Sequence, residues 1–122
     1  MLEILQTKNI QNYNELIKNL KLDINSTYVV EATDNEIVNG IGVYHFDKNV
    51  LFIDYIDSES DLTLFDGIVR SILFLTMLKG IEKAIFNQIL TETCVKLGLL
   101  EKNQNQLNTI SDFLGKCKSC EK

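Results

Sequence analysis

Residues 61–86, DLTLFDGIVRSILFLTMLKGIEKAIF, contain the pattern that decides the fold. From Phe65 to Leu73, apolar side chains recur at spacings of three and four, which predicts a helix over residues 61–79. Gly80 follows at the position where helices commonly end in a left-handed residue. Ile81–Phe86 is then typical of a short strand. Strand, helix and strand form a crossover unit, whose right-handed connection makes its two strands parallel.

Three strand-like segments precede this helix, and each is rich in β-branched and aromatic side chains. They are residues 27–32, 37–46 and 50–56. Turn-forming residues, Asp34-Asn35 and Asp47–Asn49, separate them, so the segments predict an antiparallel meander. Gly40 and Gly42 lie inside the second segment, where glycine often marks a bulge or a close backbone approach.

The remaining segments complete the order of elements. Residues 2–6 suit a short strand, and the apolar spacing within residues 9–22 predicts a helix. Residues 88–97 predict another helix, ended by Gly98, before a polar run, a final strand or turn, and a short helix near Ser111. We therefore predict an α/β fold: a mixed open sheet with helices on both faces.

Composition limits the classes of partner. The chain has 122 residues, 45% hydrophobic and 24% charged, as expected of one globular domain spanning residues 1–122. Its 17 acidic and 12 basic side chains give a net charge of −5. Nucleic-acid binding needs clustered cations that release counterions, and no such cluster is present. Nucleic acid is therefore not an expected partner.

The apolar segments do not predict a membrane protein. The longest, residues 62–78, contains Asp66 and Arg70 and is short for a bilayer span. The first residues carry neither a basic region nor a small-residue cleavage site. We expect a cytoplasmic protein without a membrane partner, and the sequence leaves a homodimer open.

The element order over roughly residues 4–100 is similar to that of the GNAT superfamily, the acetyl-CoA-dependent N-acetyltransferase fold. The local match follows the crossover, where Asn87 closes a strand as an asparagine often does in the family. Cys94 stands seven residues later, at the family's usual tyrosine, and Gly98 four residues beyond that. The segment Cys94-Val-Lys-Leu-Gly-Leu thus resembles the family's tyrosine-x-x-leucine-glycine-phenylalanine.

The resemblance implies acyl transfer from acetyl-CoA to a small-molecule amine. By position, Cys94 would be the general acid toward the departing thiolate, with solvent as the alternative. His45, in the meander that lines the acceptor cleft, would remove the proton of the amine, either directly or through water. Tyr44 is the other titratable candidate there. The residues that the resemblance places at the cofactor are Ile56, Asp57, Gly67, Ile68, Val69 and Asn87.

The expected pyrophosphate loop departs from the family pattern Q/R-x-x-G-x-G/A. Only Gly67 matches, because Leu64 and Val69 occupy the other two signature places. Glu59, Asp61 and Asp66 add negative charge around the same turn. A like-charge pair about 6 Å apart repels by roughly 3 kcal/mol at an effective dielectric of about 20, against about 0.3–1 kcal/mol of attraction from a helix terminus. We therefore predict weak CoA binding.

Several residues allow simpler interpretations. Cys94 suits a buried thiol that packs as a small hydrophobe, and His45 suits a hydrogen-bonded surface residue. Strand alternation puts Asp54 and Asp57 on opposite faces unless a bulge intervenes. Asp66 and Arg70 have the spacing of an ordinary helical ion pair.

The segment 111–122 combines a short helix with the C-x-x-C pair Cys117 and Cys120. No metal is expected, although a site of three cysteines with His45, a redox pair and an unligated tail all remain open. Two functions follow for the chain as a whole. One is an N-acetyltransferase, and the other is a degenerate member that has lost catalysis and acts as a small interaction or assembly module.

Overall fold

The computed structural model describes residues 2–115. Its strands are β1 (Leu2–Gln6), β2 (Thr27–Asp34), β3 (Ile37–Asp47), β4 (Val50–Asp57), β5 (Lys83–Phe86) and β6 (Gln106–Leu107). Its α-helices are α1 (Asn14–Asn19), α2 (Leu62–Leu78), α3 (Thr91–Lys96) and α4 (Ile110–Gly115). Short 3₁₀ segments are η1 (Ile10–Tyr13), η2 (Ile24–Ser26) and η3 (Gln88–Leu90).

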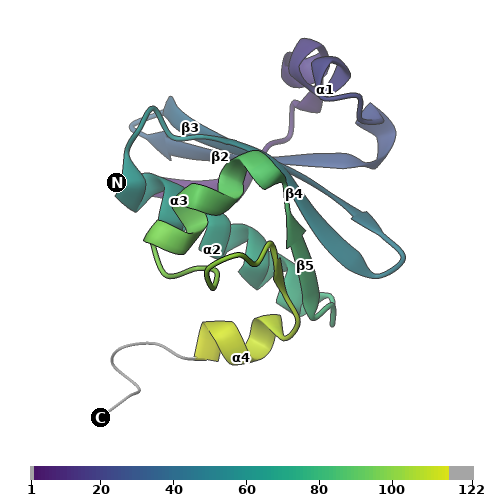
Figure 1. Ribbon diagram of the computed structural model, residues 1–122. Helices are drawn as coiled ribbons and strands as arrows, with labels where there is room; N and C mark the ends of the chain where they lie inside the picture. Colours follow the sequence, from purple (N-terminus) through teal and green to yellow (C-terminus); the bar gives the residue numbers. More distant parts are fainter. Residues whose placement is uncertain (1, 116–122) are drawn as a thin grey trace.

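The strands form one six-stranded sheet in the order β1-β2-β3-β4-β5-β6. Neighbouring strands are antiparallel except for β4 and β5, which are parallel and joined by α2. Helix α1 lies on one side of the sheet, and α2 and α4 lie on the other (Figure 1). The predicted mixed α/β sheet, with a meander that leads into a crossover, is confirmed.

The N-terminal helix is shorter than residues 9–22. It consists of η1 followed by the six residues of α1, and Lys21 then has a left-handed φ of 62°. Asparagines at 9, 12, 14 and 19 disfavour a continuous helix because their side chains compete for backbone hydrogen bonds. The predicted apolar stripe nevertheless packs as one face, since Ile17 is buried against Val29 and Val43 in a cluster between α1 and the sheet.

Gly40 and Gly42 allow α2 to approach β3 closely, as their position in the strand predicted. A Cβ added to Gly42 would lie 2.6 Å from Cγ2 of Ile68 and 2.9 Å from Cδ1 of Ile72. A Cβ at Gly40 would lie 2.9 Å from the carbonyl oxygen of Asp57. A bulge accompanies Gly40, because β2 and β3 change register between Ala32 and Thr33.

We expect Gly42→Ala to lower the free energy of unfolding by about 1–3 kcal/mol, the usual cost of forcing extra atoms into a packed core. Gly67→Ala is the matched control: its Cβ would meet only Cδ1 of Ile4, at 3.3 Å, and alanine favours a helix interior. Denaturant unfolding of both variants checks this. Equal stability of the two would contradict the close-packing argument.

Candidate functional site

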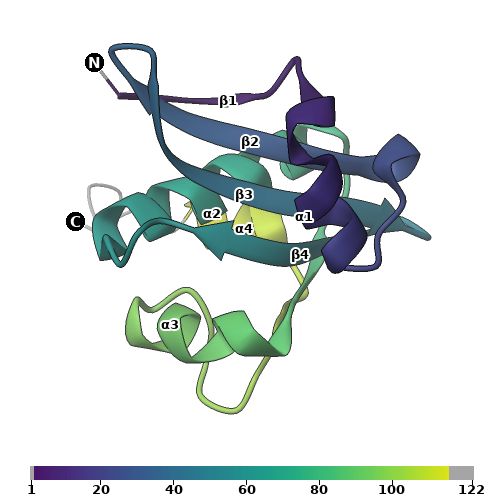
Figure 2. The ribbon, with the colours of Figure 1, turned by 90° about the horizontal axis from the view of Figure 1, so that it is seen from above.

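The parallel strands β4 and β5 separate before β4 ends. Their pairing runs from Val50 opposite Lys83 to Ile53 opposite Phe86, and the Asn87 N–H then donates to the Ile53 carbonyl at 2.9 Å. Strand β4 continues to Asp57, whereas the chain after β5 forms η3 and α3, which lies beyond the β4 edge (Figure 2). Within the described residues, no strand therefore pairs with this edge of residues 54–57.

A bulge in β4 lies at the point of separation. Tyr44 pairs with Ile53 and Val43 with Tyr55, so Asp54 is an extra residue without a partner on β3. Strict alternation fails at a bulge. Tyr55 packs into the cluster between α1 and the sheet. Asp54 contacts His45. The carboxylate of Asp57 does not join this contact, because it accepts the N–H of Glu59 at 3.1 Å.

His45 and Asp54 form a close pair on β3 and β4. Nδ1 of His45 lies 2.6 Å from Oδ2 of Asp54, and the imidazole stacks on Phe52 with centroids 4.9 Å apart and planes at 8°. The two polar side chains are 25% and 15% exposed. Burial raises the pKa of Asp54, and the hydrogen bond from His45 acts against that rise. The pair therefore places an imidazole and a carboxylate in direct contact at the edge of the core.

The outer nitrogen of this histidine is open. Nε2 makes no hydrogen bond to any described residue. No side-chain nitrogen or oxygen in residues 2–115 is both buried and without a partner, so Nε2 must reach solvent. The sequence pointed to His45 but not to Asp54, because the alternation of side chains along a strand does not reveal where a bulge falls.

Cys94 and Tyr44 lie inside the main core, the larger cluster of buried apolar side chains, which includes those of α2, rather than beside His45. Cys94 is 0% exposed, and burial raises its pKa to about 12. Tyr44 is also buried, stacks on Tyr28 at 5.5 Å and faces α2, and its pKa is raised to about 12, first by burial and then by Tyr28. These positions favour packing over acid–base roles for both side chains.

The raised pKa of Cys94 predicts that the free energy of unfolding falls at alkaline pH. A thiol ionises near pH 9 in the unfolded chain but near 12 in the folded one, so its contribution to stability is complete below 9 and is lost as pH rises toward 12. We expect the free energy of unfolding to fall less steeply above pH 9 in Cys94→Ala. Denaturant unfolding across that range measures the difference, and identical slopes would contradict it.

The residues expected at the cofactor near α2 lie within the helix itself, and the nearby Asp61 lies at its N-terminal cap. Asp61 caps this helix by accepting the N–H of Leu64 at 3.0 Å. Gly67, Ile68 and Val69 lie within the helix rather than in a loop before it, and Ile68 and Val69 are fully buried. The side chains of Ile68 and Val69 thus belong to the core.

The two strand-end residues are placed differently. Ile56 is half-buried against the main core, and Asn87 is exposed with its side-chain oxygen accepting the N–H of Ile89 at 3.1 Å. Both lie next to the separation of β4 and β5. Within the described residues, Asn87 thus makes the last backbone hydrogen bond between the two segments, and Ile56 and Asp57 lie on the part of β4 beyond it.

A cavity of about 420 Å³ adjoins the first turns of α2. Gly67 lines it together with Ser58 and Thr63, and the carboxylate residues Glu59 and Asp61 line it as well. The third predicted carboxylate, Asp66, is instead paired with Arg70 at 3.0 Å, in the predicted helical ion pair. The helix N-terminus is therefore acidic, as the sequence indicated.

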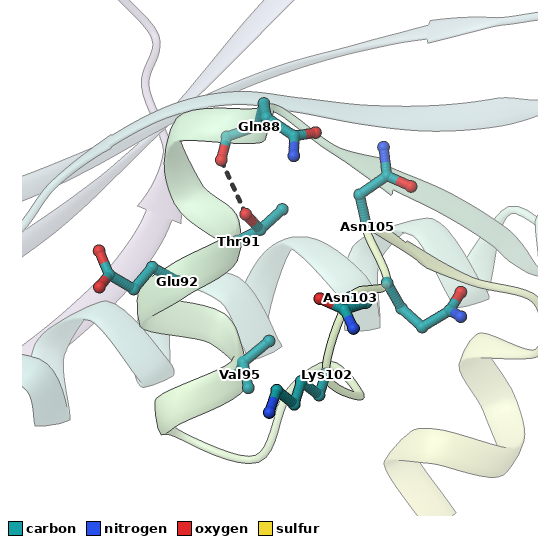
Figure 3. Close-up of a pocket in the computed structure, with 8 residues that line it drawn as sticks. Gln88, Thr91, Glu92, Val95, Lys102, Asn103 and Asn105 are labelled. Carbon is teal, nitrogen blue, oxygen red and sulfur yellow. Dashed lines mark hydrogen bonds between the residues drawn. The ribbon is translucent and has the colours of Figure 1, made fainter.

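A second cavity, of about 510 Å³, lies between α3 and the loop before β6 (Figure 3). Its wall on the helix side includes Gln88, Thr91 and Glu92, and residues 102–105 form the other side. The Thr91 hydroxyl donates to the Gln88 carbonyl at 2.8 Å. None of the predicted site residues lines it, and no sequence signal distinguished its polar loop from an ordinary one.

Two further findings concern metals and membranes. Within residues 2–115, no group of three or more His, Cys, Asp or Glu side chains is arranged to hold a metal ion, and Cys117 and Cys120 lie outside the described residues. In the same part of the chain, every helix is too short or too polar to cross a bilayer.

Comparisons with known proteins place the fold. No protein-family model and no curated protein matches the chain. Among solved structures, AAC(6′)-Iy with the bisubstrate analogue CoA-S-monomethyl-acetylneamine has a TM-score of 0.61 at 13% identity, over 85% of this chain and 94% of that one. A GNAT-family acetyltransferase of Staphylococcus aureus Mu50 has a TM-score of 0.57 at 8% identity, over 88% and 97%.

Escherichia coli YhhK bound to coenzyme A has a TM-score of 0.55 at 14% identity, over 89% of this chain and 98% of that one. Each of these matches spans nearly the whole of the neighbouring chain, at 94–98% of its length. This chain is a divergent protein with the GNAT acetyltransferase fold.

Proposed function

We propose that the chain transfers an acyl group, acetyl in the first instance, from acyl-CoA to a small-molecule amine. The observation that carries the proposal is the free β4 edge beyond Ile53, with His45 and Asp54 beside it. The likeness to the fold of CoA-containing structures supports it. The identity of the amine, the preference for acetyl-CoA, a homodimer and a cytoplasmic location remain predictions.

The free edge suits an extended ligand that carries amide groups. Backbone N–H and C=O groups of an unpaired strand edge can bind such a ligand as they would bind an added strand. We place the amide-bearing arm of CoA along residues 54–57, between Ile56 and Asn87. The pyrophosphate would approach the N-terminus of α2 near Gly67, because a helix N-terminus favours an anion. Ile68 and Val69 would support this helix from within the core.

In this scheme Nε2 of His45 accepts a proton from the bound ammonium ion and leaves a neutral amine. The amine nitrogen then attacks the thioester carbon and a C–N bond forms. The C–S bond breaks, the thiolate leaves with the electron pair, and the nitrogen gives its remaining extra proton to solvent. Solvent protonates the thiolate, because the thiol of Cys94 is buried. Holding donor and acceptor together provides much of the rate enhancement of such a reaction.

Thermal melting with and without acetyl-CoA tests the proposal first. A ligand at 100 times its dissociation constant adds about 2.7 kcal/mol to the free energy of unfolding. We expect a concentration-dependent rise in melting temperature, followed by release of free CoA thiol when a panel of small amines is added. A melting temperature that does not change at saturating acetyl-CoA would contradict the proposal.

The acidic cavity favours a second candidate, a non-catalytic interaction module. Glu59 and Asp61 line the place where the pyrophosphate would lie, and Asp61 already caps α2. This candidate predicts no acetyl-CoA effect on melting together with self-association or partner binding. A concentration series in sedimentation measures self-association, and a flat series would count against an assembly role.

A further inference from the structure

We propose that Asp54 is a positioning residue for His45: its carboxylate holds the imidazole with the proton on Nδ1 and leaves Nε2 as the proton acceptor. The inference rests on the proposed function and adds a residue to it. The carboxylate of Asp54 touches His45, and we assign this carboxylate no contact with substrate or cofactor.

The hydrogen bond determines which nitrogen is free. An ionised carboxylate only accepts hydrogen bonds, so a neutral imidazole beside it must donate through the nitrogen that faces it. The facing atom is Nδ1, at 2.6 Å from Oδ2. Nε2 then carries the lone pair, and this is the atom that has no partner within the described residues.

The ring is held in two ways. Phe52, the cross-strand partner of His45, lies parallel to it at 4.9 Å and restricts the plane of the imidazole. Asp54 restricts rotation within that plane through the bond to Nδ1. A general base held by both contacts loses little freedom when the amine binds, which is the condition for efficient proton transfer.

The bulge explains why Asp54 can do this. Asp54 is the extra residue between Ile53 and Tyr55, which pair with Tyr44 and Val43. It has no residue opposite it on β3, so its side chain can turn toward His45. Bulges often redirect a side chain next to an active site. Here the bulge directly follows Ile53, whose carbonyl accepts the last bond between β4 and the β5 segment. The pair therefore lies where the two strands begin to separate.

Nuclear magnetic resonance tests the tautomer without any activity, because His45 is the only histidine in the chain. Long-range ¹H–¹⁵N spectra, recorded above the usual titration range of histidine, distinguish Nδ1–H from Nε2–H. We expect Nδ1–H in the wild type and a shift toward Nε2–H in Asp54→Asn. The control Asp47→Asn removes an exposed carboxylate at the end of β3 and should leave the wild-type spectrum. Wild-type Nε2–H, or no change in Asp54→Asn, would overturn the proposal.

Kinetics of the same variants test the catalytic consequence. We expect Asp54→Asn to lower kcat by at least about 10-fold, a part of the 10²- to 10⁴-fold that a positioned base provides. The KM for acetyl-CoA should stay near the wild-type value, and Asp54→Glu should recover part of kcat. A change in KM alone, or an unchanged kcat, would overturn the positioning role. Absence of acyl transfer by the wild type would instead overturn the proposed function itself, whatever tautomer the spectra show.

Discussion

His45→Gln is expected to reduce kcat for acyl transfer by about 10²- to 10⁴-fold, the contribution usual for a general base. Glutamine keeps a polar side chain on β3 but has no basic nitrogen to accept the proton of the amine. The KM for acetyl-CoA should change little, because we propose that the cofactor lies along β4 rather than on His45. Steady-state rates of CoA release, measured over a range of both substrates, give kcat and KM separately.

Tyr44→Phe is the matched control for this variant. Tyr44 precedes His45 in β3 but faces the opposite side of the sheet, where it is 2% exposed and packs beside Tyr28 and Phe46. Its kcat should remain close to wild type. If instead Tyr44→Phe abolishes transfer and His45→Gln does not, the chemistry lies on the α2 face of the sheet and the proposed base is wrong.

Removing the negative charge at the N-terminus of α2 should strengthen CoA binding. In Glu59→Gln/Asp61→Asn, two carboxylates that line the 420 Å³ cavity become neutral. One like-charge pair about 6 Å apart costs roughly 3 kcal/mol at an effective dielectric of about 20 before salt screening. We therefore expect the Kd for CoA to fall by at least about tenfold, which corresponds to about 1.4 kcal/mol. Asparagine caps helices about as well as aspartate, so α2 should keep its first turn.

Isothermal titration calorimetry with CoA measures the Kd of each variant. Two controls test whether the change in Kd comes from the charge at this helix end. Glu15→Gln/Glu101→Gln makes the same change in net charge at exposed positions in α1 and in the loop after α3, and it should bind CoA like the wild type. Raising the ionic strength toward 1 M shortens the screening length to about 3 Å and should reduce the difference between the variants. Equal affinities of all three proteins at low salt would show that the pyrophosphate does not lie at this helix end.

Much of the architecture could be predicted from local patterns. The apolar spacing of Phe65–Leu73, with Gly80 after it, indicated a long helix between parallel strands, and this helix forms as α2. Gly40 and Gly42 indicated close backbone contact and lie directly against α2. Such features depend on neighbours within a few residues, so the sequence records them directly.

The N-terminal segment shows the limit of periodicity. Its apolar stripe correctly indicated which residues pack together, but the helix is limited to Asn14–Asn19. Apolar spacing reports the face that is buried. Helix length also depends on whether asparagine side chains compete for the hydrogen bonds of the backbone, and the apolar spacing does not report this competition.

The candidate site depended more on tertiary structure. The sequence pointed to His45 and Asn87 as candidate site residues. Strand alternation predicted Asp54 and Asp57 on opposite faces of their strand unless a bulge intervened. A single inserted position in β4 brings Asp54 to His45, and no local residue pattern marks where that insertion falls. The polar cavity between α3 and residues 102–105 likewise forms from segments whose contact depends on the whole chain.

Sequence alone determined the order of elements, the crossover, the long buried helix and the acidic charge at its beginning, because each follows from the chemistry of neighbouring residues. Only the tertiary structure decided the bulge at Asp54, the pairing of that carboxylate with His45, the burial of Cys94 and the free edge of β4. The physical reason is that strand register, and the solvent exposure of each side chain, depend on how distant segments pack, and no single segment encodes that packing.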